Sequence, residues 1–259
     1  MRRLCLGDIH GRYDYLMDVL KKSNFDYEKD LLIQVGDLVD RGPDPFLCIQ
    51  ELMKIKNKIL IIGNHDASFV QFVAEGVDFL GNENGTAPTI EAWRELSPEE
   101  QIDILNNFFK LQRPYYISED NIMFVHGGFP LDEKLDDVTN HVFYWDRELV
   151  SQAMSCKGDQ KLKTLYDFKE IFIGHTPTIY WNKTKPIYSG GVWNIDTGSG
   201  KGGPLTIMDI DTHEYWQSDL SLADHTKLKS YGIPTEDQSS EAEEVEEREE
   251  EGRIQTKAA

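Results

Sequence analysis

The sequence predicts an α/β fold in which two packed, mixed β-sheets are flanked by helices. In the first third of the chain, short apolar runs alternate with amphipathic helical patterns, which is typical of a parallel sheet. In the last third, short strand-like runs follow one another with turn residues between them, and we expect a second, largely antiparallel sheet there. Five of the apolar runs end directly at Gly together with Asp, Asn or His. Ligands bind beyond the carboxyl ends of strands in open α/β sheets, so these ends predict one shared site.

The first part of the chain alternates strands and helices. Leu16, Val19 and Leu20 share one face of the first helical pattern, and Pro45 suits the first turn of the second. The expected order is strand 4–6, helix 12–22, strand 31–35, helix 45–56, strand 58–62 and helix 67–74.

A helical insert is expected at about residues 75–110. Residues 75–88 are rich in Gly, Asn and Glu and predict a loop over the site, and 89–110 carry two amphipathic patterns. Ser97 followed by Pro98 and Glu100 is a good start signal for the second helix. Packing against the sheet and a role in substrate binding both fit this segment.

The rest of the chain consists mainly of short strands. Runs 115–117 and 122–125 predict a hairpin, and 148–169 is mostly helix or loop. The remaining expected strands are 171–173, 186–188, 192–195, 205–210 and 214–217.

We expect one domain over residues 1–234, because candidate ligands scattered from Asp8 to His175 must converge in a single fold. Residues 235–259 read as a disordered acidic tail that lacks core-forming side chains. The tail is either a solvated appendage or a contact for a basic partner. The net charge of −19 argues against general nucleic-acid binding, which needs a positive footprint.

No charged-then-apolar leader and no run of membrane-span length is present, so we expect a soluble, cytoplasmic protein without a membrane partner. Cys5, Cys48 and Cys156 lack any paired spacing and are expected to be free thiols.

The chemistry is expected in the five strand-end loops. Mixed Asp, His and Asn ligands suit Mn, Fe or Zn better than Ca or Mg. Two such ions about 3.5–4 Å apart can activate a water as a nucleophile. Taken singly, an Asp after a strand is more often a turn former, and a lone His is more often a structural histidine. The loops read GDIHG at 7–11, GDLVDRG at 36–42, GNHD at 63–66, HGG at 126–128 and GHT at 174–176.

In this order the five loops resemble those of the calcineurin-like metallophosphoesterases. Within them the chain is most similar to the phosphoprotein phosphatase family, including its small bacterial and phage members. The resemblance covers roughly residues 2–218. It implies a four-layer fold and a dinuclear centre of two divalent metal ions, most readily Mn, with Fe or Zn as alternatives.

The resemblance also implies a role for each loop residue. Asp8 and His10 would hold one metal, Asn64, His126 and His175 the other, and Asp37 would bridge them. His65 would donate a proton to the leaving oxygen, and Asp40 would orient it. Arg41, Asn64 and Arg147, the last in the run Tyr-Trp-Asp-Arg, would bind the phosphate.

The implied function is hydrolysis of phosphomonoesters, with phosphoserine or phosphothreonine in proteins as the expected substrate. The alternative substrate is a dinucleoside polyphosphate of the diadenosine tetraphosphate type, or another small phosphoester. Asp66 stands where the protein-phosphatase branch usually has Glu, which leaves the substrate open. A binding module with a dead site would lack a ligand, and none is missing. Asp196 follows a strand and fits either the rim of the site or a simple turn.

Overall fold

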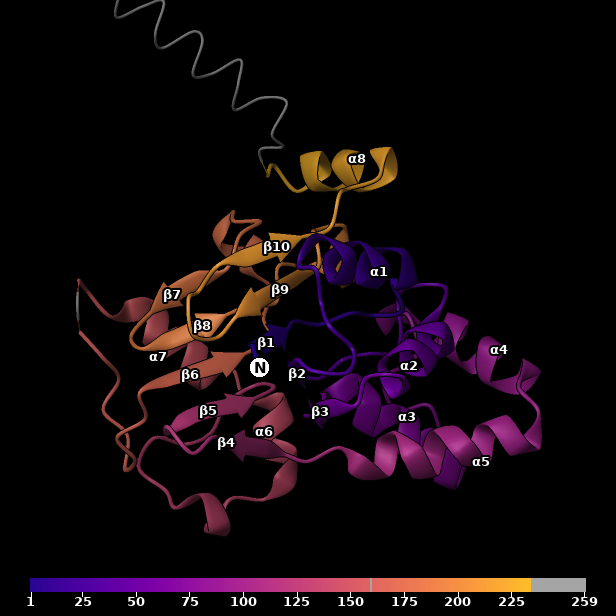
Figure 1. Ribbon diagram of the computed structural model, residues 1–259, viewed down its shortest axis with the longest axis horizontal. Coiled ribbons are helices and arrows are strands. Elements are labelled where there is room, and N and C mark those ends of the chain that lie inside the picture. Colours follow the sequence, from indigo (N-terminus) through magenta and orange to yellow (C-terminus); the bar gives the residue numbers. More distant parts are fainter. Residues whose placement is uncertain (159, 234–259) are drawn as a thin grey trace, which may run out of the picture.

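The protein forms four layers, with two β-sheets in the centre and helices on both outer faces (Figure 1). The computed structural model describes residues 1–158 and 160–233. One apolar cluster lies between the sheets and includes Cys5 and Ile33 of one sheet and Phe124 and Phe172 of the other. A second cluster joins the first sheet to its helices, and a third does the same for the second sheet. The tail expected at 235–259 lies outside the described residues.

The first sheet has the strand order β10-β9-β1-β2-β3. Its strands β1, β2 and β3 are parallel, as expected, and β9 and β10 run antiparallel to their neighbours. The strand bounds are β1 Arg3–Leu6, β2 Leu31–Gln34, β3 Asn57–Leu60, β9 Thr206–Asp209 and β10 Tyr215–Gln217.

The second sheet has the order β4-β5-β6-β8-β7 and is mixed. Its central strands β5, β6 and β8 are parallel, and the edge strands β4 and β7 are antiparallel to them. The hairpin of β4 and β5 was expected. The strand bounds are β4 Tyr115–Ile117, β5 Ile122–Val125, β6 Glu170–Ile173, β7 Ile187–Ser189 and β8 Val192–Asn194.

The expectation of a largely antiparallel second sheet is therefore wrong, because β9 and β10 return to the first sheet. Every residue of β9 is buried, with Ile207 in the helix-side cluster and Met208 in the cluster between the sheets. A strand that is apolar on both faces needs cover on both. The position beside β1 supplies that cover.

Helices α1 to α5 pack on the first sheet and α6 and α7 pack on the second (Figure 1). Their bounds are α1 Tyr13–Lys22, α2 Pro45–Met53, α3 Asn64–Glu75, α4 Ala87–Glu95, α5 Pro98–Asn107, α6 Asn140–Trp145, α7 Glu148–Ser155 and α8 Leu222–Ser230. Single 3₁₀ turns are η1 Asn82–Asn84, η2 Phe109–Leu111, η3 Leu135–Asp137, η4 Thr178–Trp181 and η5 Ser199–Lys201.

Two helix starts show how local sequence sets the ends. Helix α5 begins at the expected signal, since Glu100 accepts a hydrogen bond from the Ser97 N–H at 2.8 Å. Helix α3 begins at Asn64, three residues before the expected start. The Asp66 carboxylate accepts a bond from the Gly63 N–H at 3.1 Å and so closes the first turn early. Asn64 and His65 therefore lie at the amino end of a helix.

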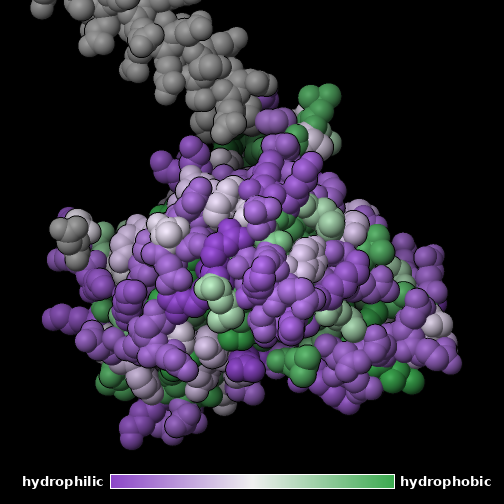
Figure 2. All heavy atoms as spheres, viewed as in Figure 1, coloured by the Kyte–Doolittle hydropathy of each residue, from purple (hydrophilic) through white to green (hydrophobic). Residues whose placement is uncertain are grey.

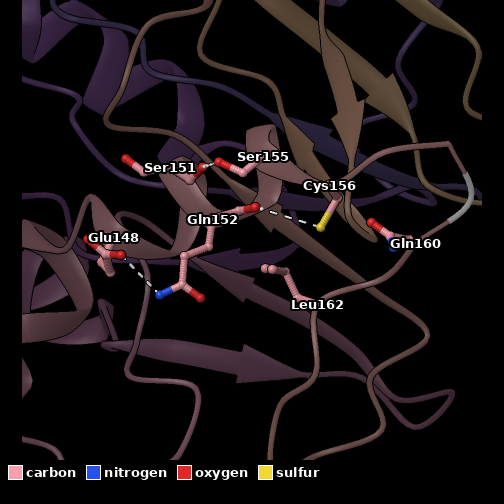
Figure 3. A pocket seen from close by; sticks show the side chains of 7 residues that line it. All are labelled: Glu148, Ser151, Gln152, Ser155, Cys156, Gln160 and Leu162. Carbon is pink, nitrogen blue, oxygen red and sulfur yellow. Dashed lines mark hydrogen bonds between the residues drawn. The ribbon is translucent and has the colours of Figure 1, made fainter.

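The face in Figure 2 is largely hydrophilic, with small apolar areas scattered over it. The three cysteines are free, as expected, and Cys5 and Cys48 are buried. Cys156 lines a shallow depression beside α7, where its thiol faces the Gln152 carbonyl (Figure 3). Among the described residues, no helix is both long and apolar enough to cross a bilayer.

Candidate metal centre and active site

The ten site residues expected from the sequence lie together at the carboxyl ends of strands. The loops after β1, β2, β3, β5 and β6 carry nine of them, and the loop between α6 and α7 carries the tenth, Arg147. Each is joined to another by a contact of 3.6 Å or less between side-chain or backbone atoms. The fold therefore brings residues as distant as Asp8 and His175 into one place.

Asp37 belongs to two groups of potential metal ligands. One group is His10, Asp37 and His65, and the other is Asp37, His126 and His175. The Asp37 Oδ2 atom is 3.6 Å from His10 Nε2, and its Oδ1 atom is 3.3 Å from His126 Nε2. A single buried carboxylate thus offers one oxygen to each side. This is the arrangement that a bridging ligand requires.

Backbone carbonyls orient two of the imidazoles. His10 Nδ1 lies 2.9 Å from the Val39 carbonyl, and His126 Nδ1 lies 2.8 Å from the Val35 carbonyl. Because a carbonyl only accepts, Nδ1 must carry a proton, which leaves Nε2 as the ring atom that faces Asp37. Metal-binding histidines are commonly fixed through the second ring nitrogen in this way.

The charge state of the histidines also suits metal binding. Burial and the nearby Arg41 hold the pKa of His10 well below its ordinary value. Burial, His126 and Arg147 lower the pKa of His175 to about 2. The pKa of His126 shifts in the other direction. Burial alone would lower this pKa, but the attraction of Asp37 outweighs burial and raises it. His10 and His175 are therefore neutral near pH 7, the form in which imidazole binds a metal.

Two buried polar atoms at the centre lack hydrogen-bond partners among the described residues. They are Asp8 Oδ1 and His175 Nε2. Such atoms are rare in folded proteins and costly, unless a ligand satisfies them. The other Asp8 oxygen accepts a bond from the His175 N–H at 3.0 Å, which fixes the carboxylate in place. These two atoms and the shared carboxylate fit a pair of divalent ions.

Asp196 adds a third buried carboxylate that the sequence reading left undecided. It follows β8, and burial, opposed by the Gly198 N–H and Arg41 but aided by Asp37, raises its pKa to about 6. Burial and the charges of Asp196 and Asp37 raise the pKa of Asp8 as well. The Asp196 Oδ1 atom accepts a hydrogen bond from the Gly198 N–H at 3.0 Å, so Asp196 also stabilises the turn after β8. The sequence signal that could have placed Asp196 in the site is an Asp soon after a strand, the same pattern as in the other loops.

A histidine and a carboxylate form a pair beside the first ligand group. His65 Nδ1 is 2.6 Å from Asp40 Oδ2, and both side chains are buried. The His65 backbone N–H donates to Asp37 at 2.9 Å, which links the pair to the shared carboxylate. A carboxylate at Nδ1 leaves Nε2 as the atom that faces the site.

Two arginines approach the site in different ways. The Arg41 guanidinium lies between two imidazoles, 2.8 Å from His10 Nε2 and 3.0 Å from His65 Nε2. Arg147 instead donates to the Thr176 hydroxyl at 2.8 Å and to the His175 carbonyl at 3.3 Å. Arg41 therefore extends over the first group and Arg147 lies beside the second.

The segment at 75–110 braces the loop that carries Asp40 and Arg41. The Asp40 N–H donates to the Thr89 hydroxyl at 2.8 Å, and the Arg41 N–H donates to the Gly85 carbonyl at 2.7 Å. A Cβ at Gly85 would lie 3.0 Å from the Arg41 Cα, so only glycine permits this approach. The insert thus contacts the site loop directly. The contact from Gly85 agrees with the loop over the site expected at 75–88, whereas the contact from Thr89 was not part of that expectation.

Five site residues have left-handed backbone conformations although none is glycine. Their φ angles are 51° at His10, 55° at Asp37, 70° at Asp40, 71° at Arg41 and 68° at His175. Residues other than glycine seldom adopt this region, and such strain gathers at functional sites.

Asp66, which stands where the protein-phosphatase branch usually has Glu, lies behind the site. Its Oδ1 accepts a bond from the Leu38 N–H at 2.9 Å, and its Oδ2 accepts one from the Gln112 amide at 2.9 Å. It therefore ties the loop after β2 to α3 and to the chain after η2.

Comparison with known proteins gives a consistent pattern. The calcineurin-like phosphoesterase family profile matches residues 1–193. A bis(5′-nucleosyl)-tetraphosphatase of Halalkalibacterium halodurans is 28% identical over 238 residues, covering 81% of this chain and 90% of that protein. Serine/threonine-protein phosphatase 1 of Salmonella typhimurium is 29% identical over 213 residues, covering 79% and 90%. The crystal structure of a candidate diadenosine tetraphosphatase has the same fold, with a TM-score of 0.62 at 18% identity, covering 85% of this chain and 94% of that one.

Proposed function

The chain belongs to the calcineurin-like phosphoesterase family, and on that premise we propose that it hydrolyses phosphomonoesters with two divalent metal ions. The observation that carries the proposal is the Asp37 carboxylate, which offers one oxygen to each of two ligand groups. The His65 and Asp40 pair beside the first group supplies the proton donor that such a reaction needs.

The chain's own residues divide between the two metals. Asp8 and His10 would hold one ion, Asn64, His126 and His175 would hold the other, and Asp37 would touch both. Asn64 Oδ1 is 3.2 Å from His126 Nε2, which supports its place in the second group. When bound, the ions would supply an activated water and neutralise charge on the phosphate. Nitrogen and oxygen donors of this mixture favour Mn, with Fe or Zn as alternatives.

The remaining residues would bind phosphate and move the proton. Arg41 and Arg147 would donate to the non-bridging oxygens, since guanidinium forks match phosphate geometry. Asn64 would add its amide at the same place. His65 Nε2 would protonate the leaving oxygen, while Asp40 stabilises the imidazolium that precedes the transfer. For this Arg41 has to leave His65 Nε2, and an incoming phosphate gives it a stronger partner.

The proposed substrate is phosphoserine or phosphothreonine in a protein, in line with the Salmonella relative. The second candidate is a dinucleoside polyphosphate, in line with the Halalkalibacterium relative. Both classes present a phosphoryl group to the same metals and arginines, so the chemistry at the centre is common to them.

The decisive experiment compares a phosphothreonine peptide, p-nitrophenyl phosphate and diadenosine tetraphosphate with Mn added. We expect turnover that chelation abolishes and Mn restores. Turnover that survives chelation in the parent, or that is unchanged in Asp37→Asn, would contradict the proposal. The ratio of kcat/KM between the peptide and the tetraphosphate assigns the substrate class.

A further inference from the structure

We propose that Lys201 and Lys227 form a second anion-binding subsite beside Arg41, which takes the phosphates that follow the one hydrolysed. The inference rests on the proposed function, because it extends the same site toward oligophosphate substrates. Three observations carry it: the position of the two lysines, their lack of partners, and the cations around them.

The loop at 198–203 brings the lysines to the site. Lys201 ends η5 in this loop, and a Cβ at Gly200 would lie 2.8 Å from the Arg41 Cδ atom and closer still to the His10 ring. The loop backbone is therefore packed directly on the first ligand group. The Lys227 side chain reaches the same loop from α8, since a Cβ at Gly202 would lie 3.0 Å from its Cδ atom.

Within residues 1–158 and 160–233, neither ammonium group has an ion-pair or hydrogen-bond partner. The Lys201 ammonium lies 5.8 Å from the centre of the exposed Tyr180 ring. Asp224, the carboxylate that lies three residues before Lys227 on α8, already has other partners. It accepts from both Arg12 terminal nitrogens at 3.1 and 3.2 Å and from the Tyr15 hydroxyl at 2.5 Å.

Several other cations lie near Lys227. Burial lowers the pKa of Lys227, and the charges of Lys201, Arg12 and Arg41 lower it further against the attraction of Asp224. Of these cations Arg12 is paired with Asp224, whereas Lys201, Lys227 and Arg41 form no ion pair with a carboxylate among the described residues. Unpaired like charges repel one another unless an anion lies between them. In a chain with a net charge of −19, such a cluster marks a place for an anion.

The chemistry of the anion follows from its neighbours. A phosphate bound by Arg41 and the metals would place the next phosphate of an oligophosphate chain toward the loop at 198–203. A phosphomonoester of serine or threonine has a carbon substituent there and would leave both lysines unused. The subsite therefore favours nucleoside oligophosphates and gives the second candidate substrate a physical basis.

The test uses inhibition, so that it does not depend on which substrate is hydrolysed in the cell. Inorganic tripolyphosphate and orthophosphate are compared as competitive inhibitors of p-nitrophenyl phosphate hydrolysis by the full chain with Mn. The variant Lys201→Met with Lys227→Met removes both charges and keeps the apolar stems. The matched controls are Lys134→Met, an exposed lysine elsewhere, and Lys201→Arg with Lys227→Arg, which restores the charges. Equal Mn in every arm makes chelation by tripolyphosphate cancel between variants.

We expect the double Met variant to weaken tripolyphosphate inhibition by at least about tenfold, with the orthophosphate constant and kcat/KM for p-nitrophenyl phosphate within about twofold of the parent. The Arg pair should recover most of the loss, and Lys134→Met should change nothing. An unchanged tripolyphosphate constant, or an equal loss for both inhibitors, would overturn the subsite. If the parent shows no metal-dependent hydrolysis of p-nitrophenyl phosphate, the proposed function is overturned instead, so the two failures are distinguishable.

Discussion

The two sheets contribute different chemistry to the candidate site. Loops of the first sheet carry His65 with Asp40 and the shared carboxylate Asp37, all braced by backbone contacts from other segments. Loops of the second sheet carry His126, whose ring is oriented by the Val35 carbonyl, and His175, whose ring is kept neutral mainly by burial. In the proposed mechanism, the groups that move the proton therefore all lie on the first half of the molecule, and the two histidines of the second half serve only as metal ligands. Substitutions in the two halves should therefore affect different properties of the enzyme.

The largest expected effect comes from the residue that serves both halves. Asp37→Asn removes the charge that faces His10 on one side and His126 on the other. We expect loss of both metals and of nearly all activity. Metal analysis of the purified variant checks this, with Asp132→Asn, an exposed acid, as the control. Two tightly retained metals would show that Asp37 does not bridge.

A lesion confined to the first half should spare the metals. His65→Asn removes the proposed proton donor, so we expect kcat on an alkyl phosphate to fall by roughly 10²–10⁴ with metal content unchanged. The defect should be smaller on p-nitrophenyl phosphate, whose leaving group barely needs a proton. Activity within about threefold of the parent on the alkyl ester would exclude His65 as the acid.

The second half should control phosphate binding. Arg147 is held by Thr176 and the His175 carbonyl, and a monoester offers it an oxygen that a diester does not. We expect kcat/KM for p-nitrophenyl phosphate to exceed that for bis-p-nitrophenyl phosphate by at least about tenfold, or roughly 1.4 kcal/mol. Arg147→Ala should shrink this ratio by lowering monoester activity more than diester activity. Equal or faster diester hydrolysis by the parent would favour a phosphodiesterase.

A smaller effect should come from breaking the contact between segment 75–110 and the loop that carries Asp40. Thr89→Val removes the acceptor for the Asp40 N–H and leaves that buried donor unpaired, which costs about 1–3 kcal/mol. We expect a lower melting temperature and kcat reduced by about three- to tenfold, with both metals retained. Thr89→Ser keeps the hydroxyl and should restore kcat. If Val and Ser behave alike, the hydrogen bond has no part in positioning Asp40.

The smallest effect concerns α8, which carries Lys227. Although burial opposes it, Arg12 and the hydroxyls of Ser221 and Tyr15 hold the pKa of Asp224 below its ordinary value of about 3.9. A carboxylate whose pKa is depressed in the folded state stabilises the fold fully above its ordinary, unfolded-state pKa. This stabilisation is lost progressively as the pH falls from there toward the folded-state pKa. The parent should therefore lose more unfolding free energy than Asp224→Asn between about pH 5 and pH 3. Equal losses would mean that the pair contributes nothing to stability.

Much of this architecture is readable from the sequence, because local patterns set most of the elements. The alternation of β1 to α3 and the hairpin of β4 and β5 follow from periodicity and turn residues, and these predictions are confirmed. Which sheet β9 joins depends on cover for both of its faces, and no local pattern records that. The start of α3 was placed too late because the Asp66 cap was not recognised.

The sequence predicted the location of the site to a similar extent. Residue type and order identified the ten positions that the fold brings together, although their individual roles stay predictions. The sequence does not contain the contacts of Thr89 and Gly85 with the Asp40 loop, because they depend on how a distant segment packs. Nor does it reveal the place of Arg41 between two imidazoles, which is a matter of tertiary geometry.

The left-handed residues of the site have a consequence for anyone who tries to make this protein more heat-resistant. Each of His10, Asp37, Asp40, Arg41 and His175 occupies a backbone region that glycine adopts freely and other residues adopt at a cost of about 1–3 kcal/mol. Selection for thermostability alone would accept glycine at these positions wherever the lost side-chain contacts cost less than the relieved strain. The most stable descendants would then be inactive. Directed evolution of this scaffold therefore needs an activity screen in every round.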